Sequence, residues 1–138
     1  MKSPVPILEF RGNDPTGHGY YGAKRGTRKH KGVDVLATPG ENVMAPISGV
    51  ITKYGWVYKN HKAGKPHMRY VEITGDMYRM WIMYTDLSKM NVGDRVFVGD
   101  VLGKSQDVSA YWGGSMKNHL HLLVWKYGLL TDPEPLLE

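Results

Sequence analysis

The stretch His119-Leu-His-Leu-Leu-Val-Trp125 is rich in apolar side chains and indicates a β-strand. Because side chains alternate between the two faces of a strand, His119 and His121 would share one face. Leu120 and Leu122 would then point the other way, into a core. A strand with one apolar face must bury that face against another layer. This stretch therefore predicts a sheet that packs over a hydrophobic core.

Shorter alternating segments occur elsewhere in the chain. Residues 70–74 and 78–84 predict two strands joined by a turn at 74–76, with Ile82 and Tyr84 on one face. Further short strands are expected at residues 95–98 and 101–102. Seventeen glycines and eight prolines interrupt the chain, and no segment keeps a helical period for more than about two turns. The sequence therefore predicts an all-β domain of antiparallel strands, a sandwich or a folded-over sheet, with little helix.

Length and composition restrict the class of protein. A chain of 138 residues, 41% hydrophobic and 22% charged, has the size and balance of one soluble globular domain. No run approaches the roughly 20 apolar residues of a membrane span, and no signal peptide is visible at the N-terminus. The sequence has no cysteine, which excludes disulfides, thiolate metal sites and cysteine nucleophiles. A metal site must therefore use His, Asp or Glu.

The charge of the chain is unevenly distributed. The net charge is +5, yet residues 1–69 hold 12 Lys or Arg against four acids, whereas residues 70–138 hold six against nine. The basic half suits an anionic partner such as an anionic cell-wall polymer, or it is simply a solvated surface. Because no helix-turn-helix, zinc-finger or aromatic ribonucleoprotein motif is present, nucleic acid is not the expected partner.

Two pairs of residues have the chemistry of metal ligands. His30 and Asp34 lie four residues apart, and a bend at Gly32 would bring them together, because glycine bends most readily. On a strand, His119 and His121 would lie about 6–7 Å apart on one face. One imidazole of such a pair can bind a metal while the other contacts a water or substrate oxygen. Taken alone, each pair is better explained by ordinary surface residues.

Taken together, the two pairs predict a catalytic zinc site. Two His and one Asp are three ligands of the kind that zinc accepts, and three protein ligands leave the fourth position for water. Zinc lowers the pKa of its bound water to about 7, which produces a nucleophile for an amide carbonyl. The remaining histidine would act as a general base or stabilise the oxyanion.

Several motifs in this order resemble those of the lysostaphin-type (LytM) zinc metallopeptidases. They are His30-x-Gly-x-Asp34, then Pro39-Gly40 with Val43-x-Ala-Pro-x-x-Gly49, then Val92-Gly-Asp-x-Val96 with Gly99-Asp-x-Leu-Gly103, then His119-Leu-His121. The resemblance covers about residues 30–125 and implies a compact antiparallel fold with long loops around a groove. It also implies hydrolysis of peptide cross-links in bacterial peptidoglycan. By position, it assigns one zinc to His30, Asp34 and His121, and makes His119 the catalytic histidine.

One departure from the family pattern concerns catalysis. The family usually has Tyr-x-His-Leu on a middle strand, whereas this chain has Tyr84-Thr-Asp86-Leu. Asp86 would act as a base or orient His119, and Tyr84 would donate to the oxyanion. A carboxylate copies the donor role of an imidazole only if its pKa is raised. The resemblance extends to phage-encoded members and to the vertebrate leukocyte cell-derived chemotaxins, which depart from the pattern at the same strand.

We therefore predict a single domain over residues 1–138, with a loop-rich segment 1–29, a family core 30–125 and a tail 126–138. Its predicted function is that of a zinc endopeptidase acting on peptidoglycan at the cell wall, in the periplasm, outside the cell or on a phage particle. The alternative is a module of the same fold that binds zinc without cutting.

Aromatic and histidine side chains outside these motifs have two interpretations each. Trp112, together with Tyr20 and Tyr21, would form a stacking wall for sugar or peptide, or would anchor loops on the core. His61 and His67 lie in a polar loop and are expected to be exposed to solvent.

Overall fold

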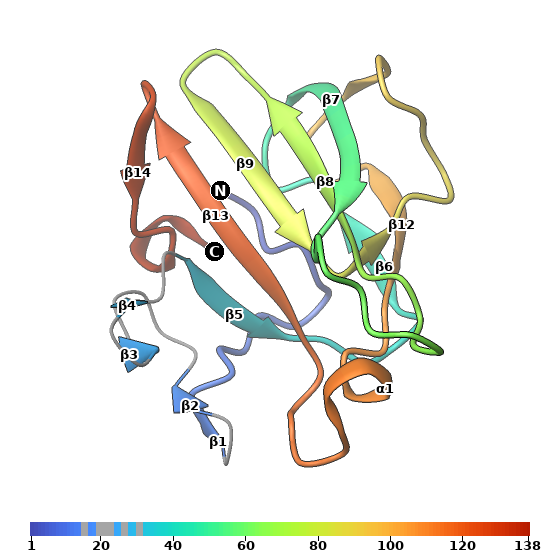
Figure 1. Ribbon diagram of the computed structural model, residues 1–138. Helices are drawn as coiled ribbons and strands as arrows, with labels where there is room; N and C mark the ends of the chain where they lie inside the picture. The colour runs from blue at the N-terminus through green and yellow to red at the C-terminus, as the bar shows by residue number, and fades with distance from the viewer. Residues whose placement is uncertain (15–16, 19–23, 26–27, 30–31) are drawn as a thin grey trace.

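A seven-stranded antiparallel sheet is the main layer of the protein (Figure 1). The computed structural model describes residues 1–14, 17–18, 24–25, 28–29 and 32–138. Along the sheet the strands follow the order β11-β7-β8-β9-β13-β14, and β5 pairs with β13. The strands are β5 (Val33–Leu36), β7 (Gly49–Trp56), β8 (Arg69–Thr74), β9 (Tyr78–Met83), β11 (Arg95–Val96), β13 (His119–Lys126) and β14 (Leu129–Thr131).

Smaller elements surround this sheet. A three-stranded sheet has the order β10-β12-β6, from strands β10 (Thr85–Asp86), β12 (Val101–Ser105) and β6 (Asn42–Met44). Two short ribbons pair β1 (Asn13–Asp14) with β2 (Gly17–His18) and β3 (Lys24–Arg25) with β4 (Arg28–Lys29). In the part of the chain that the structure describes, helix is limited to α1 (Ser109–Trp112) and the 3-10 turn η1 (Glu134–Leu136). Within the described ranges, none of the helices has the length and apolar character needed to cross a membrane.

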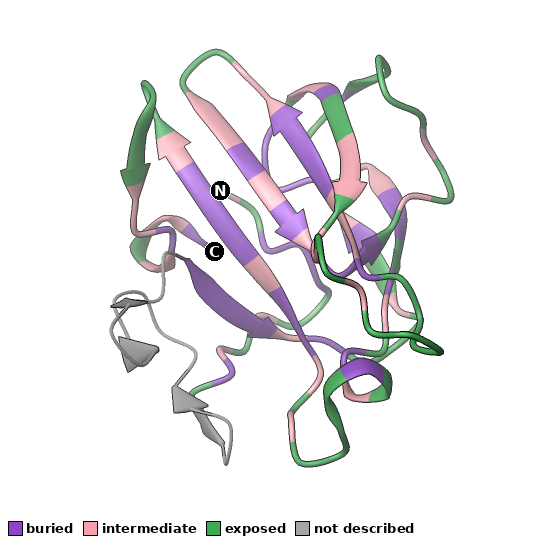
Figure 2. Cartoon of the chain, in the orientation of Figure 1, coloured by how far each residue is buried: buried purple, intermediate pink, exposed green. Residues whose placement is uncertain are grey.

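The hydrophobic core lies on one face of the large sheet. Apolar residues at alternate positions of the central strands, such as Val33 and Val35 on β5 and Leu120 and Leu122 on β13, are fully buried there. Figure 2 shows that β5 and most of β13 are buried. Side chains of the three-stranded sheet, including Val43 and Leu102, belong to the same buried cluster. The opposite face of the sheet carries the polar and aromatic residues of the same strands. This alternation fixes which side chains of β5 and β13 are left to form a site.

The structure confirms the all-β prediction and places the principal strands close to the expected positions. The predicted segments 70–74, 78–84 and 119–125 correspond to β8, β9 and β13. The expectation that Tyr84 continues the alternation of β9 was wrong, because β9 ends at Met83 and Tyr84 has a φ of 68°. This left-handed conformation ends the strand and redirects the tyrosine ring.

Candidate functional site

The register between β5 and β13 brings the predicted site residues together. His121 lies directly opposite Asp34, and His119 lies opposite Leu36. Directly opposed residues share a face of the sheet, and so do residues two apart on one strand. Asp34, His119 and His121 therefore project from the same face, away from the core.

Asp34 lies at the centre of this group. Its carboxylate accepts a hydrogen bond at Oδ1 from His121 Nδ1 at 2.7 Å. Its other oxygen, Oδ2, accepts a hydrogen bond from Arg11 Nη1 at 2.7 Å and lies 3.7 Å from His119 Nε2. Asp34 is 1% exposed and Arg11 is 4% exposed. A buried carboxylate is thus surrounded by one permanent cation and two imidazoles.

Sequence reasoning did not identify Arg11. Residues 9–11 run along the edge of β5 that does not pair with β13. There, Leu36 N–H donates to the Glu9 carbonyl and Arg11 N–H donates to the Asp34 carbonyl. These backbone bonds bring the Arg11 side chain to the carboxylate. No local periodicity marks a lone arginine as a partner of a residue 23 positions away.

His119 is held in one tautomer. Its Nδ1 lies 2.7 Å from the Lys117 carbonyl oxygen, which can only accept, so Nδ1 carries the proton. Burial lowers the pKa of His119, and this effect outweighs the opposing influence of the Asp34 charge. The lowered pKa favours the neutral imidazole, in which Nε2 carries no proton and faces Asp34 Oδ2 at 3.7 Å.

Tyr84 forms the opposite wall of the site. Its ring meets the His119 ring edge-on, with centroids 5.4 Å apart. Its hydroxyl lies 2.8 Å from that of Tyr58, which also accepts a hydrogen bond from Trp112 Nε1 at 2.6 Å. Burial, followed by the neighbouring Tyr58, raises the pKa of Tyr84 well above its usual value. The phenol therefore remains protonated and can act as a hydrogen-bond donor.

Asp86 lies beside this wall and is exposed to solvent. Its Oδ1 accepts a hydrogen bond from the Tyr54 hydroxyl at 3.0 Å. The hydrogen bond to His119 considered from the sequence is replaced by this contact, because the ring nitrogens of His119 face Lys117 and Asp34. Tyr54 thus joins the site as a residue that sequence reasoning missed.

The remaining predicted ligand, His30, lies outside the described residues. Among the residues that the structure does describe, no group of three His, Asp or Glu side chains is arranged to hold a metal. Asp34 and His121 carry an oxygen and a nitrogen donor of the types that zinc accepts, and the structure joins them by a hydrogen bond of 2.7 Å. Their role as ligands stays a prediction.

Gly32 was expected to allow a bend in the chain, and the structure gives it a second role in close packing. The chain does bend there, as the sequence predicts. A Cβ at this position would overlap the carbonyl oxygen of Leu122 and would lie 3.1 Å from His121 Nε2. Glycine is therefore needed for the close approach of the chain before β5 to strand β13.

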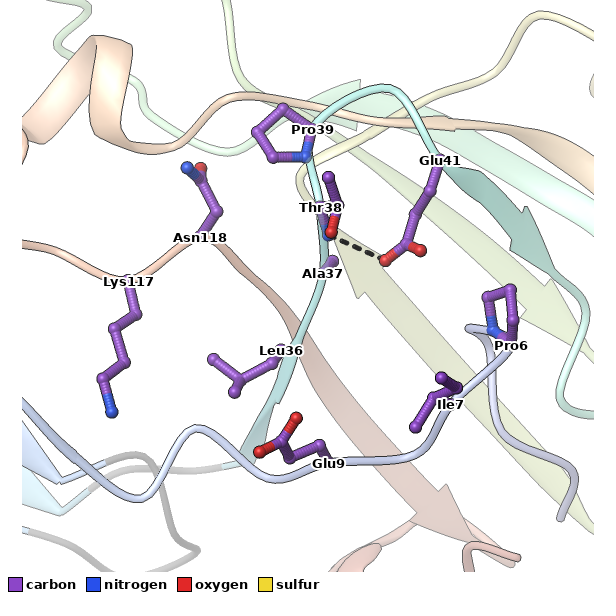
Figure 3. A pocket seen from close by; sticks show the side chains of 10 residues that line it. All are labelled: Pro6, Ile7, Glu9, Leu36, Ala37, Thr38, Pro39, Glu41, Lys117 and Asn118. Atoms are coloured by element: carbon purple, nitrogen blue, oxygen red, sulfur yellow. Dashed lines mark hydrogen bonds between the residues drawn. The ribbon is translucent and has the colours of Figure 1, made fainter.

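A pocket of about 550 Å³ adjoins the site at the end of β5 and the start of β13. Figure 3 shows its lining, in which the Thr38 N–H donates to Glu41 Oε1 at 2.8 Å. Lys117, whose carbonyl orients His119, is one of the residues that line this pocket. Its lining residues are Pro6, Ile7, Glu9, Leu36, Ala37, Thr38, Pro39, Glu41, Lys117 and Asn118.

Comparison with protein families matches residues 28–133 to the family described as peptidase family M23. The chain belongs to peptidase family M23. This confirms the resemblance to the lysostaphin-type peptidases that the motifs indicated. The match includes both histidine motifs and the strands between them.

Curated M23-like relatives include bacterial and vertebrate proteins. Glycyl-glycine endopeptidase ALE-1 of Staphylococcus capitis is 33% identical over 126 residues, covering 88% of this chain and 33% of the relative. Leukocyte cell-derived chemotaxin-2 of Bos taurus is 30% identical over 114 residues, covering 83% and 72%. Myeloid protein 1 of Gallus gallus is 32% identical over 120 residues, covering 85% and 35%. The chain thus spans about a third of two of these relatives.

A solved M23-type structure gives the same fold. The catalytic domain of the antimicrobial peptidase lysostaphin from Staphylococcus simulans superposes with a TM-score of 0.62 at 28% identity. The superposition covers 87% of this chain and 89% of that domain. The likeness supports an M23 peptidase fold for almost the whole chain.

Proposed function

We propose that this M23 protein is a zinc-dependent endopeptidase that hydrolyses peptide cross-links of bacterial peptidoglycan at the cell wall. The observation that carries the proposal is the pairing of Asp34 with His121 across β5 and β13, with the neutral His119 beside them. A carboxylate and an imidazole in contact, next to a second imidazole whose Nε2 carries no proton, would supply ligands and a base in one place.

The predicted ligands of one zinc are His30, Asp34 and His121. Bound zinc would supply a water of lowered pKa and would polarise the scissile carbonyl. Arg11 has a separate role, because its bond to Asp34 Oδ2 holds the carboxylate with Oδ1 toward His121. A hydrogen-bond partner of this kind holds a ligand side chain in its binding orientation before the metal binds.

The other residues of the site would transfer protons and stabilise the negative charge that develops on the substrate. His119 Nε2 accepts a proton from the attacking water, while the Lys117 carbonyl keeps the ring in the correct tautomer. The Tyr84 hydroxyl donates to the developing oxyanion, since its neighbour Tyr58 can in turn donate to it. His119 then returns this proton to the leaving amine, and Asp86, held by Tyr54 at the solvent edge, accepts the proton that the new carboxyl group releases.

The test combines metal analysis with a wall-digestion assay on one preparation. Zinc is quantified by mass spectrometry, and soluble peptides released from purified peptidoglycan are counted with and without chelator. We expect one zinc per chain and release that stops when the metal is removed. A preparation without zinc would contradict the ligand assignment, and zinc-loaded protein that releases nothing from walls of several chemotypes would contradict the enzymatic one.

A second candidate function is a zinc-binding module that does not cut. The observation that favours it is the solvent-exposed Asp86 at the position where the family pattern has histidine. The variant Asp86→His separates the two functions. If the missing histidine is the only defect, this change produces activity; in an enzyme that already uses Asp86, it leaves activity unchanged or lowers it.

A further inference from the structure

One continuous segment of the chain concentrates positive charge. Residues 53–70 carry five Lys or Arg and no Asp or Glu. The segment comprises the end of β7, the following loop and the start of β8. Its cations are Lys53, Lys59, Lys62, Lys65 and Arg69. A surface with one sign of charge attracts a ligand of the opposite sign and raises its local concentration.

The same segment forms an aromatic pocket of about 370 Å³. Its lining residues are Trp56, Tyr58, Lys59, His61 and His67. The rings of His61 and His67 are stacked with centroids 3.9 Å apart, and Trp56 lies 4.6 Å from His67. Trp56 remains 56% exposed despite these contacts. The expectation that both histidines belong only to a solvated loop was incomplete, because they form part of this pocket.

The pocket is connected to the M23 site through tyrosine hydroxyls. Tyr58 lines the pocket and its hydroxyl lies 2.8 Å from that of Tyr84, whose ring packs against His119. Trp112 extends the aromatic surface toward solvent, with Lys62 Nζ 4.1 Å from its ring centroid. A polymer with one segment at His119 would therefore have its neighbouring segment at the pocket.

We propose that this cationic aromatic pocket binds an anionic glycan, a chain of sugars bearing carboxylate or phosphate groups, beside the peptide that is cut. The proposal rests on the proposed function, because it places the sugar part of the substrate polymer next to its peptide part. The indole of Trp56 carries the Arg69 guanidinium over its ring, with Cζ 4.1 Å from the centroid, and is still 56% exposed, so its remaining surface can contact the C–H groups of a sugar ring. Lys59 and Lys62 supply the charges that pair with the acidic groups.

Binding to soluble polymers tests the pocket without requiring catalysis. The probes are polygalacturonate for carboxylated sugars, phosphomannan for phosphorylated sugars, dextran for neutral sugars, poly-glutamate for charge without sugars, and oligodeoxythymidylate for nucleic acid. Kd values are measured by calorimetry on the full chain at two salt concentrations. We expect binding of at least one acidic sugar polymer, weakened at high salt, and at least tenfold weaker binding of dextran and poly-glutamate.

Matched variants assign the binding to the pocket. Trp56→Ala should weaken binding about tenfold, whereas Tyr127→Ala, at another exposed ring, should change it less than about twofold. The double variant Lys59→Glu with Lys62→Glu should remove binding. Its control, Lys89→Glu with Lys126→Glu, changes the net charge equally at exposed sites elsewhere. Thermal unfolding of each variant verifies that it is folded.

Three outcomes would overturn the proposal that this pocket binds an anionic glycan. Poly-glutamate binding as tightly as the acidic sugars would show attraction by charge alone. Tighter binding of oligodeoxythymidylate would indicate a nucleic-acid surface. If the control variants lost as much binding affinity as the pocket variants, the binding would not be located at this pocket. The variant His119→Ala separates this inference from the proposed function, because it should lose peptide release and keep Trp56-dependent binding. Wild-type protein that binds but releases no peptide would contradict only the enzymatic proposal.

Discussion

Two buried carboxylates lie on the same face of the large sheet, and their surroundings differ. Asp34 is 1% exposed and faces Arg11, His121 and His119. Glu72 is 4% exposed and accepts hydrogen bonds from Thr52 Oγ1 at 2.6 Å, Trp81 Nε1 at 2.7 Å and Arg79 Nη1 at 3.2 Å. Both carboxylates have a guanidinium partner, so burial beside an arginine does not by itself distinguish a functional carboxylate from a structural one.

The distinction lies in the other partners. The donors around Glu72 are an indole, a hydroxyl and a guanidinium, none of which gives up its proton to bind a metal. The Nδ1 of His121 beside Asp34 can exchange its proton for a cation, because neutral imidazole is a common metal ligand. The comparison therefore predicts that Asp34 is a ligand and that Glu72 holds strands together. The following variants test this distinction.

The largest effect is expected for Asp34→Asn. The change removes a buried negative charge that Arg11 faces, and breaking such a buried pair costs about 3–5 kcal/mol of unfolding free energy. It also removes a predicted zinc ligand, so the zinc content should fall far below one per chain. Urea unfolding and metal analysis measure the two effects. A variant with full zinc content would show that Asp34 and Glu72 are both structural.

The next largest effect is expected for His119→Ala. Loss of a general base lowers the rate about 10²–10⁴-fold, while zinc content should stay at one per chain because His119 is not a predicted ligand. The matched variant His121→Ala should lose zinc and activity together. Peptide-release rates and metal analysis on both proteins distinguish the two roles. If both histidine variants lost zinc equally, the separation of base and ligand would be wrong.

Glu72→Gln should affect stability and leave zinc content unchanged. Although burial raises the pKa of Glu72, hydrogen bonds from Thr52, Trp81 and Arg79 outweigh it and lower the pKa below its usual value. A lowered folded-state pKa contributes stability above the ordinary carboxyl pKa of about 4.3, and this stability is lost as the pH falls through the folded-state pKa. We expect a loss of about 1–3 kcal/mol at pH 7 that shrinks under acid.

Urea unfolding of wild type and Glu72→Gln at pH 7 and at pH 3 measures this difference. The observation that would contradict it is a stability gap that stays constant between the two pH values. Loss of zinc in the same variant would remove the distinction between the two carboxylates altogether.

The smallest effect on stability is expected for Asp86→Asn, at a third and exposed carboxylate. Its hydrogen bond with Tyr54 lies at the surface, so the unfolding free energy should change by less than about 0.5 kcal/mol. The rate of peptide release should nevertheless fall, because the amide cannot accept a proton. A large loss of stability would instead place Asp86 with Glu72 as a structural residue.

The sequence predicted the parts of the site that follow from strand alternation. The shared face of His119 and His121 depends only on a two-residue period, and that period is visible in the chain. Arg11 and the contact between Tyr58 and Tyr84 were not predictable in this way. Arg11 reaches Asp34 through pairing along the strand edge, and the tyrosine contact depends on the positive φ of Tyr84. Both depend on tertiary geometry that no short-range pattern encodes.

The hydrogen bond between Asp34 and His121 joins residues 87 positions apart. During synthesis, the ribosome delivers Asp34 long before the strand that carries both histidines. A nascent chain that ends before β13 holds neither the predicted base nor the second described ligand. If the protein cuts peptides, the cell that makes it is therefore shielded from a chain that stops short of β13, because the cutting groups meet only after that strand has been made.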